Sequence, residues 1–497
     1  MKKITFKSEC SNFNVFTYCC NIIRVKKYQT IFCVCFLFVI CTQLNIHAYL
    51  YGNQTNKGRE LNIEKPSFSV LGNNEDLNNI SNQIPAIRSL FGITQDMYSN
   101  RELSDLMTEY DRFEKDIATK ENIFDIKPVQ FLKHLTSPCW IGRLDDGLQE
   151  MDDCMSWTSD SVVCNSQFQV RLDLREIWTE RHKQGTRWRL RCLPYYYILG
   201  SPKCATTDLH LRLVQHPNIL SSSAKEYHFW TKNRWDNDIG NNMMKHLKPY
   251  VDAFDMVAEN IREEFTENGR EELITGDGTP YSVYHYHGNL DDENHLTLDV
   301  DYITHLQQDK VRFIVILRDP IARLYSDYFF WNNVEIDADD FSCRINFHSL
   351  CIHAIRLFEN CLERNSVKFC VYHQANEEGL GKAGMFRITV GIYYIFIEEL
   401  LQRLSMKNLL ILKTEEYSKS MRSTFSETFR FLGVPWENYI FENYPAIVKP
   451  GKANVNQVRQ VMPRMYLQTT QMLQDFYGKY NKKLSDLLGG DTFQWGY

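Results

Sequence analysis

Positive charge is scarce in this sequence of 497 residues, where 56 lysines and arginines face 62 aspartates and glutamates for a net charge of −6. An acidic total gives no support to general nucleic-acid binding, and a protein that bound a polyanion would need a local basic groove. The sequence also lacks the Cys-x-x-Cys and Cys/His spacings of zinc sites, and it has no internal repeat. We therefore expect no bound metal ion and no nucleic-acid partner.

Cysteine, in contrast, is plentiful, with 15 in the chain. Six lie in or before the first apolar segment and nine follow it. Setting aside Cys204 leaves eight of these nine, an even number that favours disulfides in an oxidising compartment over a metal site. Cys361 and Cys370, with a polar turn between them, are predicted to pair with each other. Cys343 and Cys351 form a second predicted pair, and Cys204 is predicted to stay reduced.

The beginning of the chain has the pattern of a membrane anchor. Residues 1–30 carry six basic side chains against the single acidic Glu9, and residues 31–51 are largely apolar. About 20 apolar residues can span a bilayer, and basic residues before the span favour a cytosolic tail. We expect an uncleaved signal anchor of a type II membrane protein, with Asn53 and Asn79 glycosylated on the luminal side. A cleaved signal peptide is the alternative, which the long leader and the poor cleavage pattern disfavour.

Residues 52–135 are expected to form a luminal stem, and residues 136–497 the main folded domain. Apolar density is low around residues 71–83, and the spacing between Arg88 and Leu135 predicts one packing helix. The main domain then alternates strand and helix patterns, which predicts an α/β fold with a central parallel sheet and helices on both faces. The expected strands are 195–199, 219–222, 273–276, 311–317 and 409–412, and the expected helices are 252–265, 321–331, 392–404 and 418–432.

The most informative stretch follows the first of these strands. The strand pattern breaks at a Gly-Ser-Pro turn and reopens as a helix, a geometry that gathers backbone N–H groups and a helix dipole around a phosphate. Lys203 adds a full positive charge, but it follows the glycine too closely for a Walker A loop, which argues against an ordinary nucleotide hydrolase. A plain turn with an exposed lysine is the alternative. The predicted phosphate-binding residues are Gly200, Ser201, Pro202, Lys203, Cys204, Ala205, Thr206 and Thr207.

A second candidate phosphate site follows the strand pattern at residues 311–317. Arg318 comes at the carboxyl end of this strand, and Ser326 falls eight residues later in the following helix. A guanidinium group and a hydroxyl that converge on one spot suit a phosphate monoester. The alternative is that Arg318 pairs with a structural carboxylate such as Asp319 or Asp327.

A third candidate segment, Lys225-Glu226-Tyr227-His228, follows the expected strand 219–222 and should lie at the same edge of the sheet. An alcohol is a weak nucleophile, so a transfer reaction to a hydroxyl needs a base beside it. Glu226 fits that role, Lys203 would stabilise the leaving group, and His228 is a further catalytic candidate. The alternative is a surface ion pair between Lys225 and Glu226 with His228 as a core histidine.

Together these segments resemble the phosphate-binding motifs of sulfotransferases that use 3′-phosphoadenosine 5′-phosphosulfate (PAPS). The resemblance runs from about Cys139 to the end of the sequence, and it is strongest to the carbohydrate sulfotransferases that act on O6 of N-acetylgalactosamine 4-sulfate. One departure is Ala205, where the family loop usually carries glycine. The matching segments are Leu193-Pro194-Tyr195, Lys225-Glu226, Arg318 to Tyr328, Leu357 to Cys361 and Asp491 to Trp495.

The resemblance implies a P-loop-like sulfotransferase domain at residues 136–497, facing the Golgi lumen, with PAPS as co-substrate and no metal. It further implies a glycosaminoglycan acceptor, chondroitin or dermatan sulfate, and a base in the Lys-Glu-x-His segment. Two alternatives stay open. A heparan-type sulfotransferase would share every motif, and a non-catalytic glycan- or nucleotide-binding protein on this fold has Ala205 as its one sequence argument.

Overall fold

The computed structural model describes residues 80–155, 168–233, 246–288, 290, 296–331, 341–376, 386–451 and 463–497, all within one compact unit, Glu75–Tyr497. The predicted tail and anchor, residues 1–51, and the predicted glycosylation sites Asn53 and Asn79 lie outside the described residues. None of the helices in the described ranges is both long and apolar enough to cross a membrane. The anchor and the luminal orientation therefore stay predictions.

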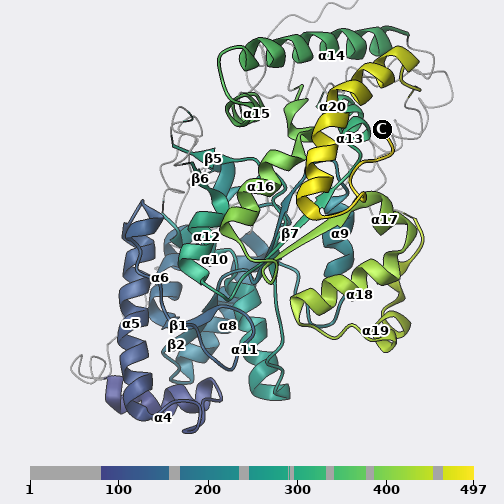
Figure 1. Ribbon diagram of the computed structural model, residues 1–497. Coiled ribbons are helices and arrows are strands. Elements are labelled where there is room, and N and C mark those ends of the chain that lie inside the picture. The colour runs from purple at the N-terminus through teal and green to yellow at the C-terminus, as the bar shows by residue number, and fades with distance from the viewer. Residues whose placement is uncertain are drawn as a thin grey trace, which may run out of the picture. The chain divides into compact units, whose positions relative to one another are not determined.

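A sheet of four parallel strands lies at the centre of this unit (Figure 1). Its order is β4 (Gly276–Asp277), β3 (Tyr196–Gly200), β7 (Arg312–Leu317) and β8 (Leu409–Lys413). The parallel sheet is confirmed, but the strand expected at 219–222 is only a single bridge from Ile219 to Ile274. The serines that follow bond to nearby backbone carbonyls instead, which competes with pairing to a neighbouring strand.

The alternation of side chains along the strands separates two hydrophobic cores, one on each face of the sheet. On one face, Tyr196, Ile314 and Leu410 belong to the same cluster as side chains of α9, α18 and α19. On the other, Tyr197 and Phe313 belong to a cluster with side chains of α12, α13, α16 and α20. The predicted arrangement of helices on both faces is thus confirmed. These helices are α9 (Thr206–Leu213), α12 (Asp299–Gln307), α13 (Pro320–Trp331), α16 (Tyr393–Arg403), α18 (Met421–Leu432), α19 (Asn438–Asn443) and α20 (Leu467–Leu488).

Most elements expected around the sheet appear within a few residues of their predicted limits. The helix expected at 418–432 is divided, because α17 (Thr414–Lys419) ends at Lys419 and α18 begins at Met421, with Ser420 between them. The remaining short elements are η1 (Ile123–Asp125), η2 (Phe229–Asn233), β5 (Tyr286–His287), β6 (Thr297–Leu298), η6 (Thr389–Gly391) and η7 (Pro445–Val448).

Two helices precede the region that the sequence assigns to the main domain, α4 (Ile80–Leu90) and α5 (Asn100–Thr119). Ser99 and Glu102 form a capping box at the start of α5, and the apolar side chains of this helix are buried in the cluster that also holds Tyr197 of the sheet. The expected packing helix is therefore α5. Its burial makes the described part of the predicted stem, residues 80–135, continuous with the core of the main domain.

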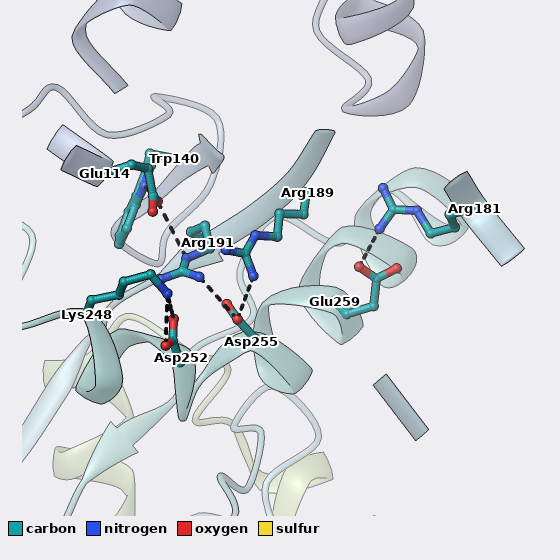
Figure 2. A network of polar contacts seen from close by, with 9 residues as sticks. All are labelled: Glu114, Trp140, Arg181, Arg189, Arg191, Lys248, Asp252, Asp255 and Glu259. Atoms are coloured by element: carbon teal, nitrogen blue, oxygen red, sulfur yellow. Dashed lines mark hydrogen bonds and ion pairs between the residues drawn. The ribbon is translucent and has the colours of Figure 1, made fainter. Parts of the chain in front are cut away.

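An antiparallel pair of strands that the strand pattern does not predict lies next to these helices. It consists of β1 (Cys139–Arg143) and β2 (Trp188–Cys192), with Cys139 and Cys192 directly opposite and joined by a disulfide. Two arginines of β2 are fully buried and meet aspartates at the end of α10 and the start of α11 (Figure 2). The helices of this region are α6 (Leu144–Met155), α8 (Phe168–Lys183), α10 (Lys248–Asp252) and α11 (Asp255–Asn268).

The remaining cysteine predictions concern α14 (Phe341–Leu362) and α15 (Val367–Asn376). The predicted disulfide between Cys361 and Cys370 is confirmed, because the turn between the two helices brings them together. The predicted pair of Cys343 and Cys351 is wrong, since both are buried thiols. They lie eight residues apart on one helix, roughly 12 Å along its axis, whereas a disulfide needs Cα atoms about 4.4–6.8 Å apart.

Candidate functional site

The candidate phosphate loop joins the carboxyl end of β3 to the start of α9. The N–H of Ser201 donates to the carbonyl of Ile316 on β7 at 2.9 Å, and the N–H of Cys204 donates back to Ser201 at 3.2 Å. A side chain at Gly200 would come within 2.5 Å of Val283, so only glycine fits where the chain leaves the strand. No side chain caps α9, which leaves the first N–H groups of the helix available to an anion.

Three segments distant in sequence form hydrogen bonds with this loop. Arg318 donates from Nη1 to the carbonyl of Lys203 at 3.2 Å, and the hydroxyl of Thr414 donates to the carbonyl of Cys204 at 2.9 Å. Tyr393 lies 3.7 Å from the sulfur of Cys204 and donates its hydroxyl to the carbonyl of Arg318 at 2.9 Å. The loop carbonyls are thus occupied by the protein itself.

Cys204 behaves as predicted, because it is a fully buried thiol. Burial raises its pKa to about 11, and the contact with Tyr393 and the charges of Arg323 and Arg318 lower it by less. The thiol is therefore neutral at physiological pH, and it packs beneath the loop.

Backbone conformation marks the same loop. The described residues include five non-glycine residues with a positive φ, and three of them are Lys203 at 67°, Ala205 at 72° and His228 at 53°. Such conformations cost free energy for residues other than glycine and cluster at functional sites. Glycine adopts the left-handed conformation of Ala205 at lower cost, which is consistent with the glycine usual at this position in the loop that the sequence resembles.

Two cations lie beside the loop. The ammonium group of Lys203 sits 3.6 Å from the centre of the Phe330 ring on α13. Arg318, at the end of β7, forms no ion pair with a carboxylate in the described part of the chain. The alternative role of Arg318 as a structural partner of Asp327 is wrong, because that carboxylate is paired with Arg323 and Arg387.

The last residues of the chain, 493–497, contact Asp319 and its partner Glu415. Tyr497 donates its hydroxyl to Asp319 at 2.7 Å, and Trp495 donates to the carboxylate of Glu415 at 3.0 Å. Glu415 in turn accepts the backbone N–H of Asp319 at 2.9 Å. Asp319 is therefore also engaged away from the guanidinium of Arg318. The predicted partner Ser326 lies two turns into α13, where it is 6% exposed.

Glu226 lies between the ammonium group of Lys225 and the imidazole of His228, next to the start of α9. Its carboxylate forms an ion pair with Lys225 through one oxygen and lies 3.3 Å from Nε2 of His228 through the other. The ammonium group of Lys225 also lies 3.5 Å from the hydroxyl of Thr206, the first residue of α9. The structure therefore brings the third candidate segment to the phosphate loop. The side chain of Glu226 stays 30% exposed, so a ligand can reach it.

The electrostatics of this cluster favour an ionised Glu226. Burial raises the pKa of its carboxyl group, but the hydrogen bond from His228 and the positive charge of Lys225 together lower it further. Burial also lowers the pKa of Lys225, more than its pairing with Glu226 raises it. At neutral pH Glu226 is therefore a carboxylate and can accept a proton.

A neighbouring histidine, which the sequence pattern does not single out, is His210 on α9. Burial and the positive charge of Lys225 lower its pKa to about 4, so it is neutral at pH 7. Its position one helical turn after Thr206 could have drawn attention to it, but a histidine within a helical pattern is usually part of the core.

Asp277, at the end of β4, and Thr279 support the segment that carries Glu226 and His228. Both oxygens of Asp277 are occupied, one by the hydroxyl and N–H of Thr279 and the other by the hydroxyl of Tyr250. The hydroxyl of Thr279 also accepts the backbone N–H of His228 at 3.3 Å. The turn therefore positions His228, and the Asp277 carboxylate is 1% exposed.

The arrangement combines an uncapped helix start, two cations and an exposed carboxylate at one edge of a parallel sheet. It can bind a phosphorylated ligand at the loop and accept a proton from a second ligand at Glu226. Thr414 and Tyr393, whose hydroxyls contact the phosphate loop and Arg318, could not have been predicted from the sequence. They lie far from the loop in the chain, and no local pattern shows that they will contact it.

Comparisons with known proteins show what the chain is similar to. Residues 196–449 match the model of the sulfotransferase domain family. The chain is 29% identical over 473 residues to carbohydrate sulfotransferase 15 of Homo sapiens, covering 90% of this chain and 80% of the relative. The Mus musculus protein of the same name is 30% identical over 420 residues, covering 80% and 70%. A solved sulfotransferase from Alicyclobacillus acidocaldarius aligns with 62% of this chain and 100% of its own at 17% identity, with a TM-score of 0.37.

Proposed function

Because this chain belongs to the sulfotransferase family, we propose that it transfers a sulfuryl group from PAPS to a hydroxyl group of a sugar. The observation that carries this proposal is the contact chain from the phosphate loop through Thr206 and Lys225 to Glu226. The candidate base Glu226 is thus the next residue after Lys225, whose ammonium group contacts Thr206 at the start of α9. A site that only bound a nucleotide would have no need of an ionised carboxylate there.

In this proposal the loop from Gly200 to Thr207 binds the 5′-phosphosulfate of PAPS. The N–H groups at the start of α9 and the ammonium group of Lys203 would stabilise the negative charge that grows on the departing phosphate. Arg318 and Ser326 would hold the 3′-phosphate. The absence of a described carboxylate partner for Arg318 supports this role, because its charge remains available to an anion.

Glu226 would take the proton from the sugar hydroxyl as its oxygen attacks sulfur. The lowered pKa keeps the carboxylate ionised at neutral pH, and the partial exposure of its side chain gives the acceptor access. His228 would position this carboxylate through its 3.3 Å contact, while the turn at Asp277 and Thr279 fixes the backbone of His228. No step of this proton transfer requires a metal ion.

For the acceptor, we propose O6 of N-acetylgalactosamine 4-sulfate in chondroitin or dermatan sulfate. The relatives named carbohydrate sulfotransferase 15 and the resemblance of the motifs support this acceptor. We further propose that the protein is a type II membrane protein of the Golgi apparatus with its catalytic domain in the lumen, as the basic flank and the apolar segment at residues 31–51 indicate.

The test is transfer from labelled PAPS to a panel of chondroitin, dermatan and heparan sulfates, followed by disaccharide analysis of the products. Label at O6 of 4-sulfated N-acetylgalactosamine supports the proposal. Label in heparan sulfate alone would establish the heparan-type alternative. Binding of adenosine 3′,5′-bisphosphate without transfer to any glycan would contradict catalysis and leave a nucleotide-binding protein.

A further inference from the structure

A cluster of metal-ligating side chains lies between β5 and the start of α12, outside the proposed transfer site. His285 and His287 stand two residues apart, and Asp299 is the first residue of α12. The ring nitrogen Nδ1 of His285 lies 2.9 Å from Oδ1 of Asp299, and Nε2 of His287 lies 3.1 Å from the same oxygen. All three ligand atoms lie within 4.8 Å of one another.

These distances are close to the spacing of ligands around a metal ion. Imidazole nitrogens and carboxylate oxygens bind Zn²⁺ at about 2.0–2.2 Å. Two ligand atoms at the tetrahedral angle that zinc prefers lie about 3.4 Å apart, by simple geometry from those bond lengths. The two nitrogen–oxygen distances of 2.9 and 3.1 Å are a few tenths of an ångström shorter, so small movements of the side chains would admit the ion.

The carboxylate of Asp299 points to the same conclusion. The side chain is 0% exposed, and its second oxygen, Oδ2, has no hydrogen-bond partner among the residues that the structure describes. A buried carboxylate oxygen without a donor is costly, and a positive ion is one of the few groups that can compensate it. Two imidazole donors on Oδ1 alone leave Oδ2 uncompensated.

We propose that His285, His287 and Asp299 bind one divalent transition-metal ion, with Zn²⁺ as the expected occupant. Imidazole ligands favour zinc over calcium or magnesium, which prefer sites built from oxygen alone. Three protein ligands leave at least one position for water or a further ligand. The proposal departs from the expectation of no bound metal ion, because that expectation rested on the missing Cys-x-x-Cys and Cys/His spacings and not on a His-x-His pair with a distant aspartate.

The position of the ligands indicates what the ion does. Two of them come directly before the connection between β5 and β6, and the third comes directly after β6, because Thr297–Leu298 leads straight into α12. β5 and β6 pair through only two residues each. An ion held by all three side chains would fasten this short hairpin to α12, which touches the central sheet where Gln307 accepts the hydroxyl of Tyr197 at 2.9 Å. The site is therefore structural.

The experiment uses the full-length protein, stripped with a chelator and titrated with Zn²⁺ by calorimetry, and its readouts do not depend on sulfuryl transfer. We expect one ion per chain and a rise in the unfolding temperature that the chelator reverses. Co²⁺ in place of Zn²⁺ should give visible absorption from a site with mixed nitrogen and oxygen ligands. His287→Ala and the milder His285→Gln should each lower zinc affinity by at least about 10–100-fold, the loss seen when even outer partners of a metal ligand are removed.

The matched control is His182→Ala, because His182 pairs with the more exposed carboxylate of Asp145 at 2.8 Å and belongs to no metal-ligating group found among the described residues. This variant should bind zinc as tightly as the parent. If the stripped parent binds no zinc, or if His182→Ala weakens binding as much as His287→Ala does, the metal site is refuted. The cluster would then be a set of hydrogen bonds that joins β5 to α12. Because Asp299 is fully buried, the two histidine variants keep the test valid even if Asp299→Asn does not fold.

Discussion

Two regions of this protein place arginines on or just after buried strands, and they differ in what the arginines meet. On β2, the fully buried Arg191 contacts Asp252 at 2.8 Å and Asp255 at 3.2 Å, and Asp255 also meets Arg189 at 3.0 Å (Figure 2). At the end of β7, Arg318 donates to a backbone carbonyl and forms no ion pair with a described carboxylate. The arginines of β2 are neutralised by aspartates, whereas the charge of Arg318 remains available to bind an anionic ligand.

The difference separates stability from function. A buried ion pair loses much when one partner is removed, because the other charge is left without compensation in a medium that solvates it poorly. A cation that faces a ligand contributes little to folding but much to binding. Substitutions in the β2 network should therefore change stability, and substitutions around the phosphate loop should change binding or turnover.

The largest expected effect is on turnover, from Glu226→Gln. The amide keeps the size of the side chain but cannot accept the proton, so kcat should fall by about 10²–10⁴-fold. Nucleotide affinity and the unfolding temperature should stay close to the parent values, since the base acts on the acceptor. Single-turnover rates measure this effect. The control is Glu264→Gln on α11, which alters an ion pair with Arg270 and should turn over normally. Normal turnover by Glu226→Gln would move the role of base to another residue, with His228 the next candidate.

The next effect is on stability, from Arg191→Met in the β2 network. Removing this guanidinium leaves Asp252 and Asp255 short of positive charge, which should lower the free energy of unfolding by about 3–5 kcal/mol. Denaturant unfolding measures this loss. Arg143→Met is the control, because its ion pair with Asp111 is about one-third exposed, and it should cost at most about 1 kcal/mol. Equal losses in the two variants would remove the distinction between a buried network and a surface pair.

Arg318→Ala should do the opposite of Arg191→Met, weakening nucleotide binding with little loss of stability. The loss of a charge-assisted contact to the 3′-phosphate should cost about 1.5–3 kcal/mol of binding free energy. PAPS and adenosine 3′,5′-bisphosphate should weaken equally, because the 3′-phosphate persists through the reaction. Calorimetry with the bisphosphate measures it. Arg270→Ala is the control for loss of a surface arginine. A variant that unfolds early but binds normally would place Arg318 with the structural arginines.

Ala205→Gly tests the loop backbone itself. Because Ala205 has a φ of 72°, glycine removes the penalty of a left-handed alanine and should stabilise the protein by about 0.5–1 kcal/mol. Ala258→Gly within α11 should instead destabilise it by about 1 kcal/mol. Thermal unfolding compares the two. If Ala205→Gly also destabilises, the loop has a different conformation from the one described here.

The smallest effect concerns pH. The pKa of Glu226 lies below its ordinary value, so its carboxylate persists on acidification, and turnover should decline only at a pH below about 4.3, the usual pKa of glutamate. His228→Ala removes one of the causes that lower this pKa. The acid side of the pH profile should then move to higher pH, without the loss of the base that Glu226→Gln produces. A profile of kcat that does not move would show that His228 leaves the carboxylate unaffected.

Much of the site was predictable because its segments are local. The loop after β3 and the position of Arg318 after β7 follow strand patterns that the sequence displays, and the carboxyl ends of parallel strands meet at one edge. The Lys225–Glu226 segment reaches the same edge, although the strand predicted before it is only a single bridge from Ile219 to Ile274. The pairing of Cys361 with Cys370 was predictable from a turn. The pair of Cys343 and Cys351 was wrong because spacing alone does not show that a helix holds two residues apart.

The alternation of strands and helices and the chemistry of the loop depend on residues near one another in the chain, so sequence patterns predict them. Which charges are compensated depends instead on how distant elements pack. Arg191 and Arg318 have the same side chain, and their different roles come from carboxylates that α10 and α11 bring to one and not to the other. Likewise Asp299 meets His285 and His287 only because β6 returns beside β5. Such partners are set by how elements pack in space, and local patterns do not contain that information.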